Sequence, residues 1–479
     1  MQYARFFQGT SRIVGLSALA AASCFLFSGL LMAGEPNAKS TSDTAKTITF
    51  TKDIAPIFQA KCEECHRKDS MAPMSLVTYQ EARPWARSIK ERVAQRQMPP
   101  WHLDKTVGIQ KFQNDRSLSD EQIATIVKWV DSGAAQGDPK DMPPPKTWPD
   151  DKTWLLQQKF GRPPDFIVKS GEYWMPAVGQ DQWWKPLNDL PMITEARWVQ
   201  AVEMRPSTVE GRKITHHAIA HLLQDEKNNP LLGDSADASA AAAAGGGILM
   251  EWAVGKTYDI YRPNTGKLIL PGAKIWWDIH THAVGEPLKD HVELAVWLYP
   301  KDQTPKYRTY LTMFNAARSG PGEALDIPPN TVAETQGFHV LKQAAILENF
   351  QPHMHLRGKA MLLEAILPDG TIQTLSYVNN FNFNWMNNYI YADDAAPVLP
   401  KGTVIHVVAW HDNTTAKATN PDPNQWVGWG DRTVDEMAHA WVNVTYISDE
   451  DYNAWAAKHK AAHGANRASL APAPASHNN

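Results

Sequence analysis

The pentapeptide at residues 62–66, Cys-Glu-Glu-Cys-His, restricts the possible folds of this chain more than any other feature. Cys-x-x-Cys-His is the covalent attachment motif of a c-type haem, in which both thiolates add to haem vinyl groups and the histidine binds iron. Zinc binding or thiol redox chemistry is the alternative for an isolated Cys-x-x-Cys. Zinc needs a second ligand pair, however, and Cys24 is the only other cysteine. We therefore predict one haem c, attached to Cys62 and Cys65, with His66 on iron.

The N-terminus predicts export. Residues 1–12 carry two arginines and no acidic residue, and residues 13–33 are almost wholly apolar, which resembles a secretory signal. The apolar run is long for a cleaved signal, so residues 1–34 are predicted to be a signal peptide or an uncleaved membrane anchor. In either case we expect the body of the protein in a bacterial periplasm. We expect no disulfide there, because Cys62 and Cys65 are both joined to haem.

Length and composition limit the remaining possibilities. A chain of 479 residues should hold two or three domains. A formal net charge of −4 provides no basic surface for nucleic acid, so we expect no nucleic-acid partner. The chain has 19 tryptophans and 34 prolines, and long helical patterns are nearly absent after residue 150, which together predict a β-rich body.

Residues 47–138 are predicted to form a small all-α cytochrome c domain. A helix over 52–61 leads into the haem motif, and the proline at the start of 84–93 opens another. Ser119 and Gln122 form a capping box at the start of an amphipathic helix.

The second axial ligand of the haem iron is predicted to be Met98, in the sequence Met-Pro-Pro-Trp. The prolines after it would hold a rigid loop that presents the thioether. Met71 and Met74 are the rivals, but they follow His66 so closely that reaching the opposite haem face is harder. A methionine that only fills the core is the alternative for all three.

A proline-rich linker is predicted at residues 139–165, after which strands dominate. The clearest strands are the alternating run 292–298, the hairpin partners 361–367 and 371–378 around Pro-Asp-Gly, and the runs 404–410 and 441–447. The Ala- and Gly-rich stretch 235–247 is predicted to be a flexible insertion, and residues 451–479 a short helix with a disordered tail.

Three histidine clusters stand out in the β-rich body: His216 with His217, His280 with His282, and His353 with His355. Residues i and i+2 of a strand share a face, so the last pair can bind one metal together. Adjacent histidines point to opposite faces of an ideal strand, so the first pair can bind together only at a strand end or bulge. Exposed histidines without metal are the alternative for one cluster alone, but three clusters in one body favour metal binding.

Residues 166–450 resemble the copper type II, ascorbate-dependent monooxygenases, the family of peptidylglycine α-hydroxylating monooxygenase and dopamine β-monooxygenase. The resemblance rests on Ile-Thr-His-His-Ala at 214–218, Trp-Asp-Ile-His at 277–280, Pro-His-Met-His-Leu-Arg-Gly at 352–358 and Asp-Glu-Met at 435–437. It implies two all-β jelly-roll sandwich domains, at 166–345 and 346–450, each with one copper, that face each other across a solvent-filled cleft.

The resemblance also implies the ligands of both coppers. The family's electron-transfer copper takes an adjacent histidine pair and a distant histidine, which here match His216, His217 and His280. Its dioxygen-binding, catalytic copper takes His-x-His and a methionine, which match His353, His355 and Met437.

The chemistry of these ligands fits copper independently. Thioether sulfur favours Cu(I), imidazole suits both copper oxidation states, and zinc rarely recruits methionine. In the family an apolar strand residue stands directly before the third histidine ligand. His280 fits this pattern better than His282, which remains the alternative. His221 and His439 are predicted to be supporting or plain polar residues, and Met354 to point away from its flanking histidines.

Two departures from the family limit the substrate. The peptide-specific branch holds a substrate carboxylate with an arginine and a tyrosine, where this chain has Gln351 and Trp441. A glycine-extended peptide is therefore not the expected substrate. The family's disulfides are also missing, and its animal enzymes have no attached cytochrome, although similar haem modules are fused to such domains in bacterial proteins.

Monooxygenation needs two electrons per dioxygen, and a haem delivers one at a time. The haem would replace ascorbate as the electron source, and His/Met ligation suits it to accept electrons from a periplasmic one-electron donor. The sequence thus predicts a periplasmic dicopper monooxygenase that hydroxylates a C–H bond of a small organic substrate. The main alternative is a non-catalytic electron-transfer or copper-carrying protein. A haem-bearing sandwich that binds carbohydrate or a partner, with unmetallated histidines, is a further alternative.

Overall fold

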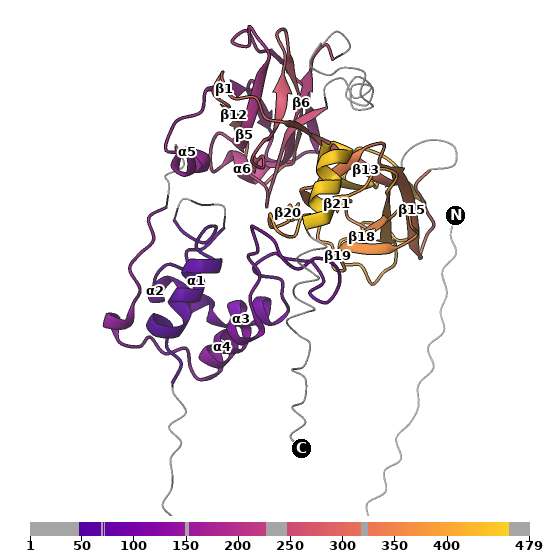
Figure 1. The fold of residues 1–479 in the computed structure, drawn as a ribbon. Coiled ribbons are helices and arrows are strands. Elements are labelled where there is room, and N and C mark those ends of the chain that lie inside the picture. Colours follow the sequence, from indigo (N-terminus) through magenta and orange to yellow (C-terminus); the bar gives the residue numbers. More distant parts are fainter. Residues whose placement is uncertain are drawn as a thin grey trace, which may run out of the picture. The chain divides into compact units, whose positions relative to one another are not determined.

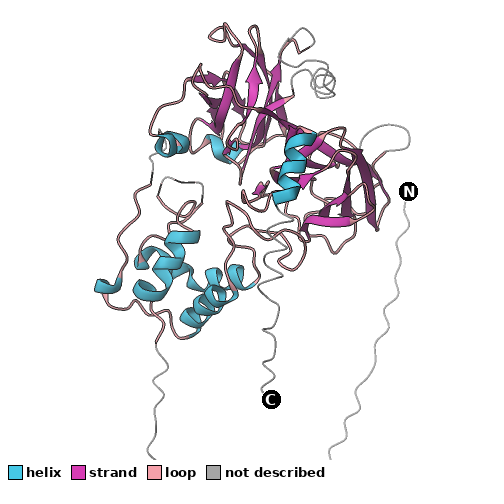
Figure 2. Cartoon of the chain, in the orientation of Figure 1, coloured by secondary structure: helices cyan, strands magenta, loops and turns pink. Residues whose placement is uncertain are grey.

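The structure is a computed structural model that describes residues 47–68, 70, 72–148, 153–226, 247–317 and 324–458. Strands dominate it and helices are few, as Figure 2 shows. No helix within these ranges combines the length and apolar character needed to cross a membrane. The predicted signal or anchor, nearly all of the predicted insertion and the predicted tail after residue 458 lie outside the described residues.

The N-terminal part is helical and has its own core. Its elements are a π-helical turn (Phe50–Ile54), α1 (Ala55–Lys61), α2 (Tyr79–Ala82), a 3-10 turn (Arg83–Trp85), α3 (Ala86–Ala94), α4 (Asp120–Asp131) and a 3-10 turn (Pro139–Asp141) (Figure 1). The capping box of Ser119 and Gln122 is confirmed at the start of α4. Phe50, Phe58 and Trp129 pack together in the buried cluster between these helices. The predicted helices are therefore present in this segment.

The first β-rich half forms two layers over one core. One layer contains β1 (Phe166–Lys169), β12 (Val292–Leu298), β5 (Arg197–Pro206), β8 (Tyr258–Ile260) and β9 (Thr265–Ile269). The other contains β6 (Thr215–Leu223), β7 (Ile248–Ala253), β10 (Lys274–Thr281), β3 (Gln182–Trp184) and β4 (Leu187–Asp189). The pair β2 (Tyr173–Met175) and β11 (Leu288–Asp290) and the short helices α5 (Leu155–Phe160) and α6 (Gly211–Ile214) complete this half.

The predicted alternation of 292–298 is confirmed in β12. Val292 and Val296 belong to the core between the two layers. Ala295 and Trp297 face the other way and pack in a separate buried cluster with Leu156 of α5. Alternate residues of one strand thus fill two hydrophobic clusters, because successive side chains of a strand leave its opposite faces.

The second half has a four-stranded sheet packed against further strands. The sheet follows the order β15 (Val332–Val340), β22 (Val404–Asp412), β18 (Gly358–Ile366) and β19 (Ile372–Val378). The facing strands are β13 (Tyr307–Ala317), β24 (Ala438–Ile447), β16 (Ala344–Leu347) and β17 (Asn349–His353). The short strand β20 (Tyr389–Ile390) pairs with β17, and β21 (Val398–Leu399) pairs with β16. A separate pair is formed by β14 (Asp326–Ile327) and β23 (Val427–Gly428). The predicted hairpin is β18 and β19, and residues 449–458 form the predicted short helix.

The change from the first core to the second falls earlier than the domain boundary expected at residues 345 and 346. Phe314 of β13 already belongs to the second core, together with Leu347 and Val444. The reason is strand pairing, since β13 pairs along almost its whole length with β24. Residues 309–317 and 324–345 therefore pack mainly with the second half.

Residues 101–112 likewise pack away from the helical core within which the sequence placed them. Trp101 and Leu103 are buried in the second core. Trp101 meets Tyr389 edge to face, with ring centres 4.7 Å apart. Isolated bridges join Leu103 to Val378 and Phe112 to Tyr391. Aromatic side chains bury a large apolar area each, so the packing of Trp101 and Phe112 ties this segment to the strands of the second half.

Candidate metal centre

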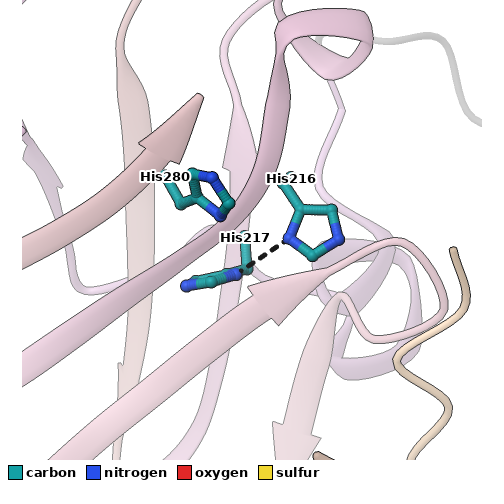
Figure 3. Close-up of side chains that lie close together, drawn as sticks. All are labelled: His216, His217 and His280. Carbon is teal, nitrogen blue, oxygen red and sulfur yellow. Dashed lines mark hydrogen bonds between the residues drawn. The ribbon is translucent and has the colours of Figure 1, made fainter. Parts of the chain in front are cut away.

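Three histidines from two neighbouring strands form one cluster. His216 and His217 lie at the start of β6, and His280 lies near the end of β10. Their ligand nitrogens all lie within 4.8 Å of one another, and Nδ1 of His216 is 3.1 Å from Nδ1 of His217 (Figure 3). Two imidazole nitrogens that bind one ion at about 2 Å each lie about 3–3.5 Å apart, so this spacing fits a shared metal. The structure thus brings together the first predicted ligand set.

A β-bulge allows both adjacent histidines to face one centre. β10 pairs His280 with His217 but pairs Thr281 with Thr215, so His216 is skipped in the register. The extra residue bends the strand locally and redirects a side chain that an ideal strand would send to the other face. A bulge or a strand end is what the sequence required if His216 and His217 were to bind one metal together.

Asp181 holds His280 in one orientation. Its Oδ2 lies 2.9 Å from Nε2 of His280 and accepts a hydrogen bond from Oγ1 of Thr433 at 2.6 Å. Nδ1 of His280 is therefore the nitrogen left for a metal, and metal-ligating histidines commonly have such a carboxylate partner. The hydrogen bond from His280 is the main reason why the pKa of Asp181 falls to about 2. His282 is outside the cluster, with its ring centre 6.5 Å from that of His216, so the geometry favours His280.

Burial keeps the rings of four of these histidines neutral, which is the form that binds metal. Burial is the main cause that lowers the pKa of His216 to about 3 and that of His217 well below its usual value, and nearby imidazoles add to the effect. Burial likewise lowers the pKa of His355 to about 4 and that of His353 well below its usual value. At neutral pH no proton has to leave these four rings before a metal binds.

The second predicted set is also close together. His353 ends β17 and His355 follows the strand, with ring centres 5.4 Å apart. Nδ1 of His355 lies 3.1 Å from the carbonyl oxygen of Asp435, which leaves Nε2 for a metal. Nδ1 of His353 is buried and has no hydrogen-bond partner among the described residues. Met354 is fully buried in the second core, as expected for a residue that points away from its flanking histidines.

Met437 precedes β24, and its neighbours tie it to the histidine segment. Nε2 of His411 lies 3.0 Å from the carbonyl oxygen of Met437. The buried carboxylate of Glu436 accepts the backbone N–H of His355 at 2.8 Å and that of Arg357 at 2.6 Å. These hydrogen bonds join two segments about 80 residues apart in the chain. The structure therefore places Met437 next to residues that position His355.

The two histidine sets are in contact, whereas the family resemblance implied a solvent-filled cleft between them. The ring centres of His217 and His353 are 6.0 Å apart. Phe383 stacks on His216 at 4.3 Å and lies 6.0 Å from His355. One continuous sheet explains this closeness, because β6 pairs with β7, β7 reaches β13, and β13 pairs with β24, which pairs with β17.

Aromatic and polar residues surround His353 where β17 pairs with β24. His439 and Trp441 stack on His353 at 4.8 and 5.1 Å. Trp441 pairs in register with Gln351, whose side-chain amide donates to the buried carboxylate of Glu251. This position therefore holds an amide paired with an acid, and no cation that would bind a substrate carboxylate.

The Cys-x-x-Cys-His motif forms a tight turn after α1. The backbone N–H groups of Cys65 and His66 both donate to the carbonyl oxygen of Cys62, at 3.1 and 2.9 Å. Nδ1 of His66 lies 3.2 Å from the carbonyl oxygen of Met74, which leaves Nε2 for iron. Burial, aided by the charges of Glu63 and Cys65, raises the pKa of Cys62 to about 12. Redox-active thiols have lowered pKa values, so thiol redox chemistry is not favoured.

The choice of Met98 as second axial ligand stays a prediction. Met98 is half-buried after α3. Its rival Met74 packs against the helical core, as Cys62 does. The other rival, Met71, lies outside the described residues.

Sequence reasoning missed three residues that shape these sites: Asp181, Phe383 and Glu436. Glu436 stands directly before Met437, so its proximity to a ligand was visible in the sequence. Asp181 is 99 residues from His280, and Phe383 is still farther from His216 in the sequence. No local pattern could have indicated either contact.

No family model matches this chain, and no curated protein matches it. Among solved structures, the chain is similar to the major capsid protein P2 of bacteriophage PM2, with 10% identity and a TM-score of 0.24 over 58% of this chain and 97% of that chain. It is also similar to the VP2 subviral particle of infectious bursal disease virus, with 12% identity and a TM-score of 0.16 over 62% of this chain and 78% of that chain. At these TM-scores neither likeness carries an argument about function.

Proposed function

We propose that this chain is a periplasmic, haem-coupled dicopper monooxygenase that hydroxylates a C–H bond of a small organic substrate with dioxygen. The observation that most supports the proposal is the cluster of His216, His217 and His280, whose ligand nitrogens lie within 4.8 Å of one another beside a second histidine pair. The apolar N-terminal stretch supports export, and residues 47–138 would be the cytochrome c domain.

Each ligand set has a role under this proposal. His216, His217 and His280 would hold the electron-transfer copper. His353, His355 and Met437 would hold the dioxygen-binding, catalytic copper. Copper at these sites would supply dioxygen activation and electron storage, and haem c on Cys62, Cys65, His66 and Met98 would supply single electrons.

The chain's own residues would orient the ligands and keep water out. Asp181 holds Nε2 of His280 and turns Nδ1 to the centre. Glu436 holds the backbone of His355, and Trp441 covers one face of His353. Both histidines of the second set are nearly fully buried, so a substrate C–H bond would meet a dry, largely aromatic environment.

Metal analysis of variants tests the proposal. Protein exported with a c-type maturation system and supplied with copper should contain one haem that resists acid–organic extraction and two coppers per chain. His280→Ala should lose one copper, and His353→Ala the other independently. His221→Ala is the matched control, because His221 packs against Trp276 outside both sets, with ring centres 4.6 Å apart, and it should keep both coppers. Zinc at both sites in protein matured with copper would contradict the proposal.

A non-catalytic copper-carrying or electron-transfer role is the second candidate. The 6.0 Å separation of the His217 and His353 rings favours it, because adjoining sets can enclose a single metal. Oxygen uptake by the reduced protein against a panel of small organic substrates separates the two roles. Substrate-dependent uptake with a hydroxylated product selects the enzyme, and one copper per chain without product selects the carrier.

A further inference from the structure

A cavity of about 280 Å³ lies between the haem-attachment motif and the strands of the β-rich body. Glu64, Cys65 and Arg67 line it, and so do Trp252 and Trp385 of the β-rich body. Cys65 is one of the two thiols to which a haem would be joined. The haem motif and two large aromatic side chains of the body therefore share one space.

The turn that carries Trp385 also reaches the first histidine set. The backbone N–H of Trp385 donates to the carbonyl oxygen of Asn382 at 3.0 Å, which closes the turn around Phe383. Phe383 stacks on His216, with ring centres 4.3 Å apart and planes inclined by 19°. One turn thus places an aromatic ring at the cavity and another on a metal-ligating histidine.

This turn is anchored to the residue that follows β7, the strand paired with that of His216 and His217. The backbone N–H of Met386 donates to the carbonyl oxygen of Val254 at 3.1 Å. Asn387, buried next to it, donates to the carbonyl oxygen of Pro100, in the loop that follows Met98. The turn is therefore hydrogen-bonded both to the body and to the loop that carries the predicted second haem ligand.

Trp252 lines the same cavity but is less well placed. It pairs with Ala218, whereas its neighbour Ala253 pairs with His217. Residues paired across two strands share a face and successive residues alternate, so Trp252 and His217 leave opposite faces of the sheet. The backbone of the sheet separates them.

We propose that Trp385 and Phe383 form the electron-transfer connection between the haem and the His216/His217/His280 copper. This inference rests on the proposed function. In each transfer one electron leaves ferrous haem, which becomes ferric, and reduces Cu(II) to Cu(I), with no bond made or broken. Electron tunnelling falls steeply with distance, and two aromatic rings on one short turn supply π-systems at both ends of the gap.

Flash photoreduction of the haem in the anaerobic, copper(II)-loaded full chain tests the connection. The haem absorbance band reports the rate at which the haem is then reoxidised. Trp385→Leu and Phe383→Leu should each slow this reoxidation several-fold, and Trp385→Phe should restore most of it. Asn384→Ala is the matched control, because it changes an exposed, non-aromatic residue of the same turn, and it should transfer at the wild-type rate.

Two further readouts separate transfer from damage to the sites. The haem reduction potential and the Cu(II) electron paramagnetic resonance spectrum of each variant should match those of the wild type. Wild-type transfer in Trp385→Leu with both sites loaded would overturn the connection and leave the proposed function standing. Absence of haem or copper from the wild-type protein would overturn the proposed function, and the connection with it.

Discussion

Arg357 connects the second histidine set to the loop before Met437, and its replacement should be costly. Its side chain is 1% exposed. Nε donates to Oδ1 of Asn413 at 2.9 Å, Nη1 to the carbonyl oxygen of Val434 at 2.8 Å, and Nη2 to that of Asp422 at 3.4 Å. One buried acceptor, on Asn413, and two partly buried carbonyl oxygens therefore share one guanidinium group.

Arg357→Met removes all three donors, and we expect it to destabilise the second half by about 3–5 kcal/mol, because each hydrogen bond to a charged donor contributes about 1.5–3 kcal/mol. Arg357→Lys keeps the charge, but one ammonium group cannot reach three separated oxygens. It should cost about 1–3 kcal/mol for the acceptors that lose their donor. Both variants should also lower copper occupancy at the second set, because Val434 lies three residues before Met437.

Peptide-resolved hydrogen exchange during a urea titration measures this effect, since a chain with several cores does not unfold in one step. Peptides from β18 and β22 report on the second half, and those from β5 and β12 on the first. Arg432→Met is the matched control, because Arg432 lies in the same loop, is 70% exposed and forms an ion pair with nearby Asp435, and it should cost less than about 1 kcal/mol. If Arg357→Met behaves like Arg432→Met, the reasoning from the three hydrogen bonds of Arg357 is refuted.

Two more predictions concern the sandwich cores. Burial raises the pKa of Glu348 to about 7 despite a hydrogen bond from Thr445. The folded state therefore holds this proton more tightly than the unfolded state does. The contribution of this carboxyl group to stability should fall as the pH rises from about 4.5 to about 7. Urea titrations across that range should show this slope in the wild type and a shallower one in Glu348→Gln; equal slopes would exclude the role. A Cβ on Gly337 would lie 1.7 Å from the carbonyl oxygen of Asn315, so Gly337→Ala should cost about 3 kcal/mol or more in the same assay. In Gly428→Ala the nearest atom is 3.6 Å away, so equal costs for the two variants would contradict the packing argument.

The sequence by itself determined features that depend on short stretches of chain. The capping box of Ser119 and Gln122 spans one helical turn, and the β18–β19 hairpin closes over a short loop, so both follow from local chemistry. The sequence also identified the histidines that cluster, because ligand residue types and spacing are visible without a fold. The sequence indicated that His216 and His217 could bind one metal only at a strand end or bulge. It did not show which partner strand would create that bulge.

Only the tertiary structure decided how those histidines are arranged. Pairing of β6 with β10 brings His280 to His217 and skips His216, and the continuous sheet brings His353 within 6.0 Å of His217. Asp181 reaches His280 from 99 residues away. Strand register and side-chain packing create such contacts, and both depend on the hydrophobic burial of the whole body, which no window of sequence contains.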